Sequence, residues 1–489
     1  MIAPERDDAS RPRTIALVRD VCAQLATEQV SWCHFKSNTF LDRSRTAEND
    51  LDLLIARADE DRFSTVMHRL GFKLARRRRQ GPPGVFDYYG HDRETGRVVH
   101  VHGHFQLVVG DDLTKSYRVP LERAFLESAR PDGEFLVPSP ELELILLVIR
   151  LTLKHLTWDA VMMRRARIPA SARSELADLE SRAETEEVER QLEQALPFVG
   201  RQAFRECRLA LAPDAGKLAG MHAGERLLAD LAPCARRSRA ADIGLKFWRR
   251  GAEIAARLAS RPVSPKQPAA GGAIIAIAGA DGAGKSTAVE ALAERLGKTF
   301  AVISAHLGKP PKSWTTRGLR NIARGRSAYL LLAQRLGRPA PSRATEHAVL
   351  ATALARDRYL TARRIRRIAT NGGLVLCDRF PLRQLKLMDG PRVERVRDPN
   401  RWRWLTDRLA ARERSYYRAI PPPDVLIVLL VDPEIAVARQ STESPDSIRS
   451  RWREVLSVDW DALPAHVVDA AQPREAVLSR LETLIWSEI

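Results

Sequence analysis

The chain has 489 residues, and its 79 Lys and Arg against 61 Asp and Glu give a formal net charge of +18. This length excludes a single hydrophobic core, so two or three domains are expected. The positive charge favours polyanionic partners such as nucleotides, nucleic acid or an anionic membrane surface, and the other interpretation is a solvated basic surface.

Five cysteines are scattered along the chain without a C-x-x-C pair, which argues against a zinc site and for reduced thiols. The first residues lack the apolar core of a signal peptide, and no apolar run reaches the length of a membrane span. We therefore expect a soluble, cytoplasmic protein.

Residues 14–130 mix short strands with helices, and a strand is expected at residues 49–55. Asp50 and Asp52 stand two positions apart on it, hence on one face, where two carboxylates can chelate a Mg²⁺ that carries nucleotide phosphates. With Lys36 and Ser37 ahead of it, the segment resembles the nucleotidyltransferase fold, in which a G-S-like turn precedes a D-x-D strand. The resemblance implies a phosphate-binding turn at Lys36 and Ser37 and metal ligands at Asp50 and Asp52. The alternative is a solvated strand face.

A neighbouring strand in that fold typically adds a third carboxylate, and residues 97–107 are the candidate here. They offer His100, His102 and His104 at alternate positions instead. Three imidazoles on one strand face can bind Zn²⁺ or a similar ion. The alternatives are a degenerate transferase, phosphate-binding histidines or a plain polar face.

Residues 139–260 are expected to be almost wholly helical and begin with a capping-type start at Ser139. Their end, residues 240–258, is basic and amphipathic, and packing on a neighbouring domain is favoured over attachment to a membrane surface. A linker rich in Pro, Gly and Ala follows at residues 261–272. The expected organisation is a nucleotidyltransferase-like domain (1–135), a helical appendage (136–260), this linker and a carboxyl-terminal domain (273–489).

A glycine-rich loop follows the linker and fits the pattern G-x-x-x-x-G-K-[ST]. The apolar run 273–278 before it predicts a buried parallel strand, and residues 287–296 after it have helical spacing. A strand, a glycine loop and a helix N-terminus form a phosphate cradle, whereas the alternative is a tight turn that binds nothing. Lys285 would reach the β- and γ-phosphates, and the Ser286 hydroxyl would ligate Mg²⁺. The nucleotide-binding residues are expected to be Gly279, Ala280, Asp281, Gly282, Ala283, Gly284, Lys285, Ser286 and Thr287.

Strands alternate with helices after the loop, which is typical of a parallel α/β sheet with flanking helices. Asp378 and Arg379 end one buried strand, and the carboxyl ends of such strands face the ligand crevice. An aspartate there can hold Mg²⁺ and an arginine can clamp a phosphate, although a strand-end ion pair is the alternative. The further strands are expected at residues 301–304, 374–377, 425–431 and 466–468.

Residues 273–487 resemble the thymidylate kinase family of nucleoside monophosphate kinases, with motifs in the same order. The loop matches the family's G-x-D-G-x-G-K-[ST]-T, in which the aspartate, here Asp281, faces the acceptor sugar. Residues 378–380 match D-R-[YF], and residues 355–358 are similar to an A-D-R segment whose arginine, here Arg358, approaches the acceptor phosphate. Residues 423–433 and 468–473 are similar to the family's P-D strand and adenine-bordering segment. The resemblance implies an ATP- and Mg²⁺-dependent kinase in which Arg358 and Arg379 hold the acceptor.

The chain also departs from the family. Gly282 supplies no charge where some members carry a loop arginine, so a basic lid at residues 439–453 is the alternative source. Arg449 and Arg453 are four apart and share a helix face there, which is also typical of a solvated basic helix. Different residues replace the acceptor-side motifs of the family, at 304–311 and 381–392, and an arginine-rich insert occupies 315–326.

We therefore predict phosphoryl transfer from ATP to a nucleoside monophosphate (dTMP-like) or a related small phosphorylated acceptor. One alternative is a nucleotide-dependent switch that controls the amino-terminal domain or a partner assembly. Another is a nucleotidyltransferase or nucleic-acid-processing enzyme, which no aromatic-plus-basic array supports. A homodimer stays an open alternative.

Overall fold

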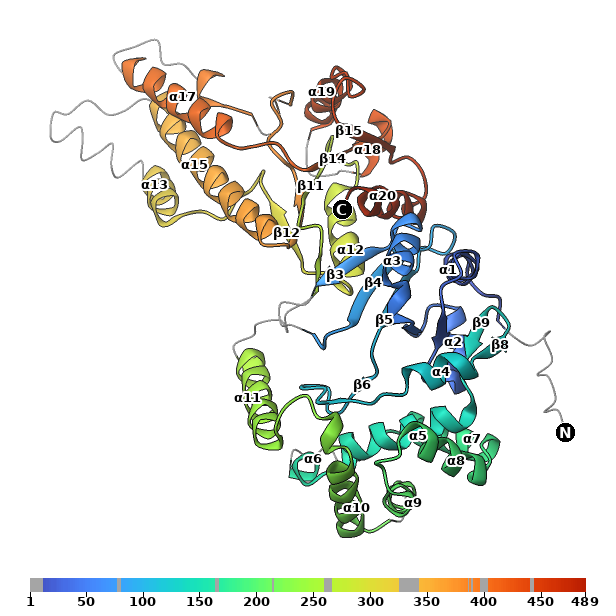
Figure 1. Cartoon of the computed structure of the whole chain (residues 1–489). Coiled ribbons are helices and arrows are strands. Elements are labelled where there is room, and N and C mark those ends of the chain that lie inside the picture. The colour runs from blue at the N-terminus through green and yellow to red at the C-terminus, as the bar shows by residue number, and fades with distance from the viewer. Residues whose placement is uncertain are drawn as a thin grey trace. The chain divides into compact units, whose positions relative to one another are not determined.

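The computed structural model describes residues 12–76, 81–162, 167–212, 215–258, 266–324, 343–385, 387, 390–395, 403–439 and 444–489. It divides into two compact units, unit 1 at Met1–Pro265 and unit 2 at Lys266–Ile489 (Figure 1). Parts of several predicted segments lie outside the described residues, among them 261–265 of the linker, 325–326 of the insert, 386 and 388–389 of the acceptor-side segment and 440–443 of the lid. In the described ranges, no helix is long and apolar enough to cross a membrane.

A mixed β-sheet forms the centre of unit 1, with its strands in the order β1-β2-β5-β4-β3. Strands β2 and β5 are parallel, and the other neighbours are antiparallel. The register places Asp52 opposite His102, and His102 opposite Asp87 on the other side. The strands are β1 (Trp32–His34), β2 (Leu51–Ile55), β3 (Lys73–Arg76), β4 (Val85–His91) and β5 (Val98–His104).

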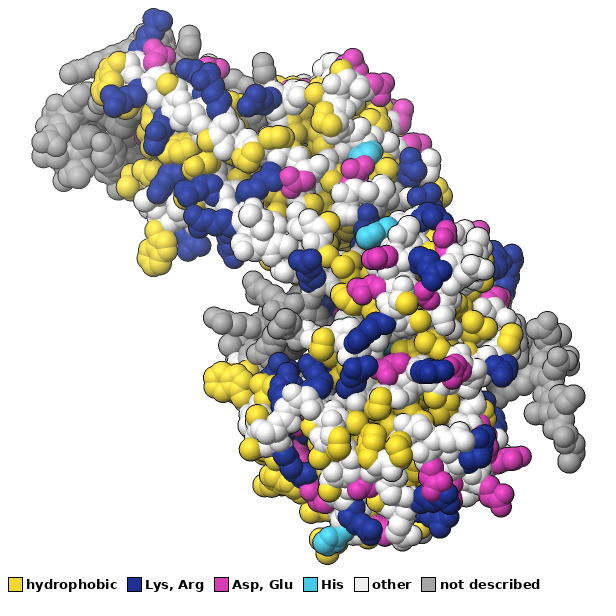
Figure 2. Space-filling view, in the orientation of Figure 1, with side chains coloured by type: hydrophobic (Ala, Val, Ile, Leu, Met, Phe, Trp, Pro, Cys, Tyr) yellow, Lys and Arg dark blue, Asp and Glu magenta, His cyan; other side chains and the backbone are white. Residues whose placement is uncertain are grey.

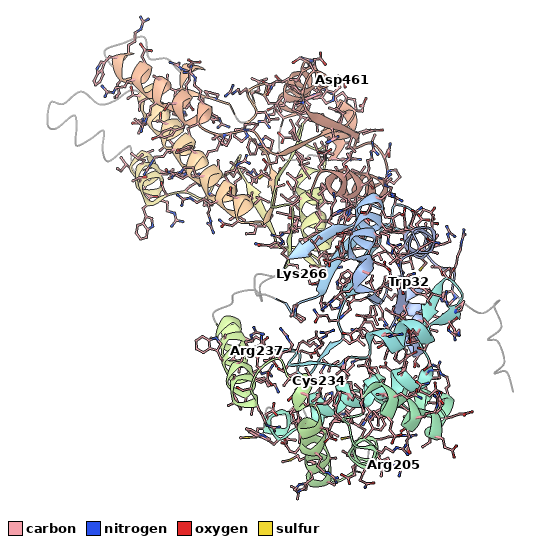
Figure 3. The ribbon with its side chains drawn as sticks, viewed as in Figure 1. Trp32, Arg205, Cys234, Arg237, Lys266 and Asp461 are labelled. Atoms are coloured by element: carbon pink, nitrogen blue, oxygen red, sulfur yellow. The ribbon has the colours of Figure 1, made fainter. Side chains whose placement is uncertain are left out.

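Strand β2 is buried at all of its positions, but its two faces differ. Leu51, Leu53 and Ile55 belong to the hydrophobic core that the sheet forms with α1 (Ala16–Thr27) and α3 (Glu60–Arg69), as does the buried Trp32 of β1 (Figure 3). Leu54 points the other way, into a core shared with the helices that follow residue 139. Because side chains alternate along a strand, Asp52 lies on this second face.

Helices make up most of unit 1 after residue 139. Ser139 caps the first of them, since its side chain accepts a hydrogen bond from the Leu142 backbone N–H. The last, α11, is fastened to the rest of the unit by buried Lys246, whose Nζ lies 2.8 Å from an Asp159 carboxylate oxygen. These helices are α5 (Pro140–Leu151), α6 (Trp158–Met162), α7 (Ala170–Arg182), α8 (Thr185–Ala195), α9 (Arg201–Ala210), α10 (Lys217–Asp230) and α11 (Arg239–Leu258). Two short helices, α2 (Leu41–Arg45) and α4 (Glu122–Ser128), come before residue 139. Two small hairpins pair β6 (Val108–Val109) with β7 (Tyr117–Arg118) and β8 (Arg130–Asp132) with β9 (Phe135–Val137).

Unit 2 contains the parallel sheet that the sequence predicts, with its strands in the order β12-β13-β11-β14-β15. The apolar runs of its central strands are buried on both faces, as expected for a parallel sheet covered by helices. The five predicted strand segments are confirmed as β11 (Ile274–Gly279), β12 (Val302–His306), β13 (Leu374–Asp378), β14 (Val425–Leu430) and β15 (Ala465–Asp469).

Helices flank this sheet, and the long α15 lies side by side with α17 (Figure 1). Strand β11 is central, with β13 on one side and β14 on the other. In such an open α/β sheet the ligand crevice lies at the carboxyl ends of the strands beside this point. The short strand β10 (Gln267–Pro268) precedes β11, and the helices are α12 (Lys285–Gly297), α13 (Trp314–Arg324), α15 (Arg343–Thr370), α17 (Arg403–Arg418), α18 (Pro433–Arg439), α19 (Pro445–Leu456) and α20 (Arg474–Glu488).

Candidate functional site

The glycine-rich loop of unit 2 joins β11 to the N-terminus of α12. Gly279 (φ 141°) and Gly282 (φ 83°) have backbone conformations that residues with a side chain rarely adopt. A Cβ at Gly279 would also come within 2.5 Å of the Leu429 carbonyl oxygen, and one at Gly282 would overlap the Ala436 backbone. These two glycines therefore let the loop pass close to the backbone of β14 and of α18.

Lys285 is the first residue of α12, and its side chain folds back over the loop. Its Nζ donates a hydrogen bond to the Ala280 carbonyl oxygen at 2.8 Å and lies 3.7 Å from an Asp281 carboxylate oxygen. The residue is only 6% exposed, so its charge is concentrated where the loop amides and the helix N-terminus already favour an anion. Such an arrangement can bind phosphate.

Ser286 and Asp378 meet across the end of the sheet. The Ser286 hydroxyl donates a hydrogen bond of 2.5 Å to Asp378 Oδ2. Asp378 Oδ1 is buried and has no hydrogen-bond partner among the described residues. A hydroxyl beside a carboxylate with an unused buried oxygen fits Mg²⁺, which prefers oxygen ligands and keeps several waters.

Asp281 is buried among three positive side chains, since Arg379 and Arg451 each bind one of its carboxylate oxygens and Lys285 lies nearby. Burial raises the pKa of Asp281, but Lys285, Arg379 and Arg451 outweigh burial and the pKa falls below its usual value. Arg379 reaches this position with φ at 57°, in the left-handed region that costs a non-glycine residue free energy. Strain of this kind is concentrated at functional sites.

The basic helix α19 contributes a residue that the sequence argument passed over. The structure brings Arg451 to Asp281, whereas the guanidinium of Arg449 lies 3.2 Å from Glu434 and Arg453 is exposed. Trp452 sets the rotation of the helix, because its indole N–H donates to the Val431 carbonyl oxygen at 2.7 Å. Periodicity alone shows that Arg449 and Arg453 share a face, but it does not show which face of α19 meets the loop.

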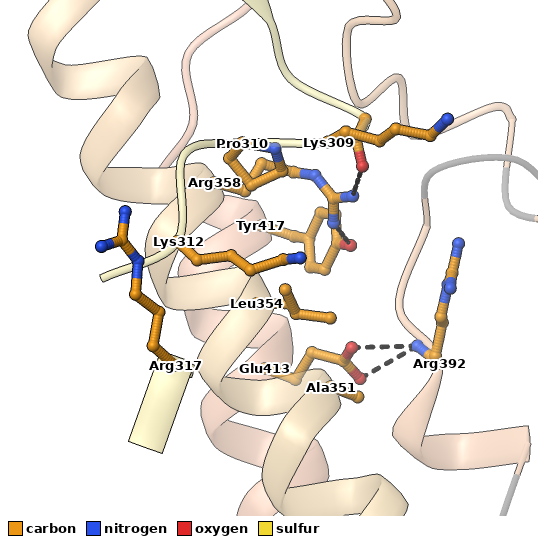
Figure 4. Close-up of a pocket in the computed structure, with 11 residues that line it drawn as sticks. Lys309, Pro310, Lys312, Arg317, Ala351, Leu354, Arg358, Arg392, Glu413 and Tyr417 are labelled. Atoms are coloured by element: carbon orange, nitrogen blue, oxygen red, sulfur yellow. Dashed lines mark hydrogen bonds between the residues drawn. The ribbon is translucent and has the colours of Figure 1, made fainter. Parts of the chain in front are cut away.

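A cavity of about 540 Å³ opens in unit 2 next to β12 and lies among α13, α15 and α17 (Figure 4). Arg358 forms part of its wall and is held by hydrogen bonds from Nε to the Leu307 carbonyl oxygen (2.7 Å) and from Nη2 to that of Gly308 (3.2 Å). The Leu307 N–H in turn donates to the Asp378 carbonyl oxygen at 3.2 Å. The cavity wall therefore begins at the strand end that carries Asp378.

The wall of this cavity is strongly basic. Glu413 is the acidic residue of the described wall, and its carboxylate already accepts hydrogen bonds from the backbone N–H groups of Arg392 and Val393. Lys and Arg side chains also gather over α15 and α17 in the space-filling view (Figure 2). A phosphate-bearing ligand suits this charge. The basic side chains in the wall are Lys309, Lys312, Arg317, Arg358 and Arg392.

The predicted residues of unit 1 form a second cluster on the sheet. Asp52 is buried, and its Oδ1 lies 2.7 Å from Lys36 Nζ and 3.2 Å from His102 Nδ1. Burial raises the pKa of Asp52, but Lys36 and the neighbouring histidines, His102 and His104, hold it well below its usual value. Asp50, just before β2, is more exposed and pairs with His100 at 2.8 Å.

Asp87 of β4 is a member of this cluster that the sequence argument missed. Its Oδ1 lies 2.9 Å from His100 Nε2 and 3.5 Å from His102 Nε2. In the sequence, Asp87 has no second carboxylate two positions away that would indicate a metal-binding strand. Only the pairing of β4 with β5 shows that Asp87 lies beside the histidines. The predicted turn residue Ser37 donates its backbone N–H to a Glu175 carboxylate oxygen at 3.0 Å.

No protein-family model matches the chain. Over 223 residues it is 24% identical to the uncharacterised ATP-binding protein YghR of Escherichia coli K12, and equally to that of Escherichia coli O6:H1, covering 43% of this chain and 86% of each relative. Among solved structures, it is similar to thymidylate kinase from Candida albicans (16% identity, 44% of this chain and 91% of that chain, TM-score 0.30). It is also similar to deoxyadenosine kinase from M. mycoides with bound dATP (15% identity, 44% and 98%, TM-score 0.28).

The cluster around Asp281 leads to a prediction about stability. Asp281→Asn removes the carboxylate that compensates three buried or half-buried cations, which typically costs about 3 to 5 kcal/mol. The pKa of Asp281 is lowered in the folded chain, so its contribution is present above the ordinary pKa of about 4 and is lost as the pH falls through the lowered value. Hydrogen exchange of the β11 and α12 amides in the full chain should show faster opening in the variant at neutral pH, with the difference shrinking below about pH 4.

Glu434→Gln is the matched control, because it removes the carboxylate of an exposed pair with Arg449. Such pairs contribute about 0 to 1 kcal/mol, so exchange should change little. Equal protection of β11 and α12 in Asp281→Asn and in the unchanged chain would contradict the prediction.

Proposed function

We propose that unit 2 binds ATP with Mg²⁺ and transfers a phosphoryl group to a nucleoside monophosphate or a related small phosphorylated acceptor. The observation that carries the proposal is the continuity of two sites. Asp378 belongs to the first site, with the glycine loop, Lys285 and Ser286. Its carbonyl oxygen accepts a hydrogen bond from the Leu307 N–H, and the wall of the basic cavity begins at the next residue, Gly308. The proposed donor and acceptor sites would therefore be adjacent.

On the donor side, the loop amides and the N-terminus of α12 would hold the ATP phosphates. Lys285 would exchange its hydrogen bond to the Ala280 carbonyl for a phosphate oxygen, which is a gain because the new partner is charged. Ser286 and Asp378 would hold Mg²⁺, which neutralises phosphate charge when bound. Arg379 and Arg451 are tethered at Asp281 within the same cluster and would supply further positive charge to the transferring group.

On the acceptor side, Arg358 would bind the acceptor phosphate from the cavity wall. Its hydrogen bonds to two backbone carbonyls and its place over the Tyr417 ring, 5.4 Å from the ring centroid, fix the guanidinium before a ligand arrives. Pre-organisation of this kind lowers the entropy cost of binding. Phosphoryl transfer depends mainly on such positioning and on electrostatic stabilisation, so the arrangement suits the reaction.

The ATP-binding description of YghR supports the donor part of the proposal. The motifs that resemble the thymidylate kinase family make dTMP the first acceptor to test. The cavity of about 540 Å³ falls within the usual range for small-molecule sites, about 300 to 1,000 Å³, and so suits a mononucleotide.

An acceptor screen with γ-labelled ATP tests the proposal. The purified chain would be incubated with Mg²⁺ and dTMP, other nucleoside monophosphates, nucleosides or sugar phosphates, beside Lys285→Ala. Label transfer that disappears in the variant supports the proposal. Mg²⁺-dependent ATP binding without transfer to any of these acceptors would overturn it in favour of a nucleotide-dependent switch.

Arg358→Met should raise the KM for the acceptor about 10- to 100-fold, since a hydrogen bond to a charged group contributes about 1.5 to 3 kcal/mol. The KM for ATP should change little, because Arg358 lies in the cavity wall and not in the loop. Steady-state kinetics with each substrate varied in turn would measure both values. Arg364→Met, an exposed arginine of the same helix, is the matched control. An unchanged acceptor KM in Arg358→Met would remove Arg358 from the acceptor site.

A further inference from the structure

Unit 1 contains a cavity of about 1070 Å³ that the proposed kinase function does not use. The second face of the sheet, with His102 and His104 of β5 and Asp87 of β4, forms part of its wall. Residues from α5, α7 and α11 form other parts. A titratable cluster thus lies at the wall of a large, open cavity.

Three side chains of this cluster have the arrangement of metal ligands. Asp52, His102 and His104 each offer one ligand atom, and these atoms lie within 4.8 Å of one another. The Asp52 Oδ1 atom is 3.2 Å from His102 Nδ1 and 3.8 Å from His104 Nε2. Nitrogen and oxygen ligands that bind one ion at about 2.0 to 2.2 Å in tetrahedral geometry are about 3.5 Å apart, so only small side-chain shifts are needed.

His104 is the residue of the cluster that points most strongly to metal binding. The residue is 7% exposed and lines the cavity. Within the described part of the chain, neither of its ring nitrogens has a hydrogen-bond partner. A buried polar group without a partner costs free energy, and a metal ion bound to one nitrogen would remove much of that cost.

The surroundings of His102 also match a metal ligand. A histidine that binds a metal through one nitrogen usually donates its other N–H to a carboxylate, which fixes the ring. With Nδ1 facing Asp52, the Nε2 of His102 faces Asp87 Oδ1 at 3.5 Å. Asp87 would therefore orient the ring of His102. The same Asp87 Oδ1 atom also lies 2.9 Å from His100 Nε2.

We propose that Asp52, His102 and His104 bind one divalent transition-metal ion, with an open coordination position that takes an anionic, phosphate-bearing ligand from the cavity. Two imidazoles and one carboxylate suit Zn²⁺, Fe²⁺ or Co²⁺ better than Mg²⁺, which prefers oxygen ligands alone. The site differs in its donor atoms from the oxygen-only Mg²⁺ site proposed for unit 2, and the two sites are independent of each other.

The charge of the cavity identifies the class of the second ligand. Among the described residues that line it, nine are Lys or Arg and three are Asp or Glu. Lys36 now pairs with Asp52, so a bound ion would replace it as the partner of that carboxylate and leave its ammonium group facing the cavity. A basic wall beside an open metal position favours an anion with phosphate oxygens. The other basic side chains in this wall include Arg150, Lys154, Arg236, Arg237 and Arg249.

Cobalt binding to the full chain tests the proposal without any enzymatic assay. The chain would be freed of metal with a chelator and titrated with Co²⁺ in the absence of nucleotide, by calorimetry and by visible absorption. We expect one ion per chain with the ligand-field bands of a nitrogen- and oxygen-bound Co²⁺. His104→Gln and His102→Gln should each weaken binding by more than about 100-fold, since even the loss of an outer-shell partner typically costs about 10- to 100-fold.

Three controls make the test specific. His100→Gln, on the same strand but outside the triad, and Asp378→Asn, in unit 2, should each retain the bound ion and its spectrum. Lys36→Met should bind Co²⁺ more tightly, because it removes the cation that competes for Asp52. Circular dichroism would confirm that each variant is folded, and His102→Gln provides a second ligand variant if His104→Gln is unstable.

Each outcome decides a part of the proposal. An unchanged chain that binds no Co²⁺, or folded His102→Gln and His104→Gln variants that bind it as tightly as the unchanged chain, would overturn the metal site. Inorganic phosphate should alter the Co²⁺ absorption of the unchanged chain. A bound ion whose spectrum does not respond to phosphate would overturn the anionic ligand.

Discussion

Lys285→Ala is expected to lower kcat for phosphoryl transfer by about 10³-fold or more, because removing a single positive charge from a transferring phosphoryl group typically costs this much. Lys285 is 6% exposed at the start of α12, so its charge is poorly screened by water. Its Nζ donates a hydrogen bond to the Ala280 carbonyl oxygen and lies near Asp281, and both residues belong to the loop itself.

Folding should be less affected than activity in this variant. The hydrogen bond that the Lys285 side chain donates reaches a carbonyl only five residues earlier in the chain. Transfer of label to the acceptor found in the screen, at saturating ATP and acceptor, would give kcat, and circular dichroism would show that the variant is folded.

Lys298→Ala is the matched control, since Lys298 lies just after the other end of the same helix. Its Nζ is 3.9 Å from Glu294, and both side chains are exposed. Removal of such a pair changes stability by less than about 1 kcal/mol, and activity should stay within about two-fold. A Lys285→Ala variant that transfers phosphate at the rate of Lys298→Ala would contradict the proposed role of Lys285.

Asp378→Asn is expected to lower kcat by about 10²- to 10³-fold and to remove most of the effect of Mg²⁺ on ATP binding. The change keeps the shape of the side chain and an oxygen that can accept the Ser286 hydroxyl hydrogen bond. It removes the negative charge that a divalent cation needs. The variant tests the function of the buried Oδ1, which has no hydrogen-bond partner among the residues that the structure describes.

The measurement is the ratio of ATP affinity with Mg²⁺ to that with a chelator. In the unchanged chain Mg²⁺ should strengthen binding, whereas in Asp378→Asn the two affinities should approach each other. Asp461→Asn, an exposed carboxylate elsewhere in unit 2 (Figure 3), is the matched control and should keep the full effect. An Asp378→Asn variant with an undiminished Mg²⁺ effect would show that the ion is held by other groups.

The elements of the proposed donor side could be predicted from local patterns in the sequence. The glycine loop, the apolar strand before it and the helix after it are contiguous, so their geometry depends on residues within about 25 positions. Asp378 could be predicted from the sequence in a similar way. It directly follows a buried apolar run, and the carboxyl ends of strands in a parallel sheet gather at one edge. The structure adds the contact between Ser286 and Asp378, which the register of β11 and β13 makes possible.

Tertiary packing decided which arginine of α19 meets the loop. Residues 449, 451 and 453 are chemically alike, and the helical period cannot show how α19 is rotated against the sheet. Trp452 decides that rotation through its bond to Val431, and Arg451 then reaches Asp281. The cavity proposed for the acceptor depends on packing in the same way, since it combines residues 308–317, 351–358, 392 and 413–417.

The glycine-rich loop, the parallel sheet of unit 2 and the carboxylates and histidines of unit 1 could thus be predicted from the sequence. Each of these follows from spacing along one strand, loop or helix, where covalent geometry restricts the positions of neighbouring side chains. Only the tertiary structure decided that Arg451 joins Asp281, that Asp87 joins the histidines, and that basic residues enclose two cavities. These contacts join segments that are far apart in the chain, and their geometry comes from strand pairing and helix packing, which no local pattern contains.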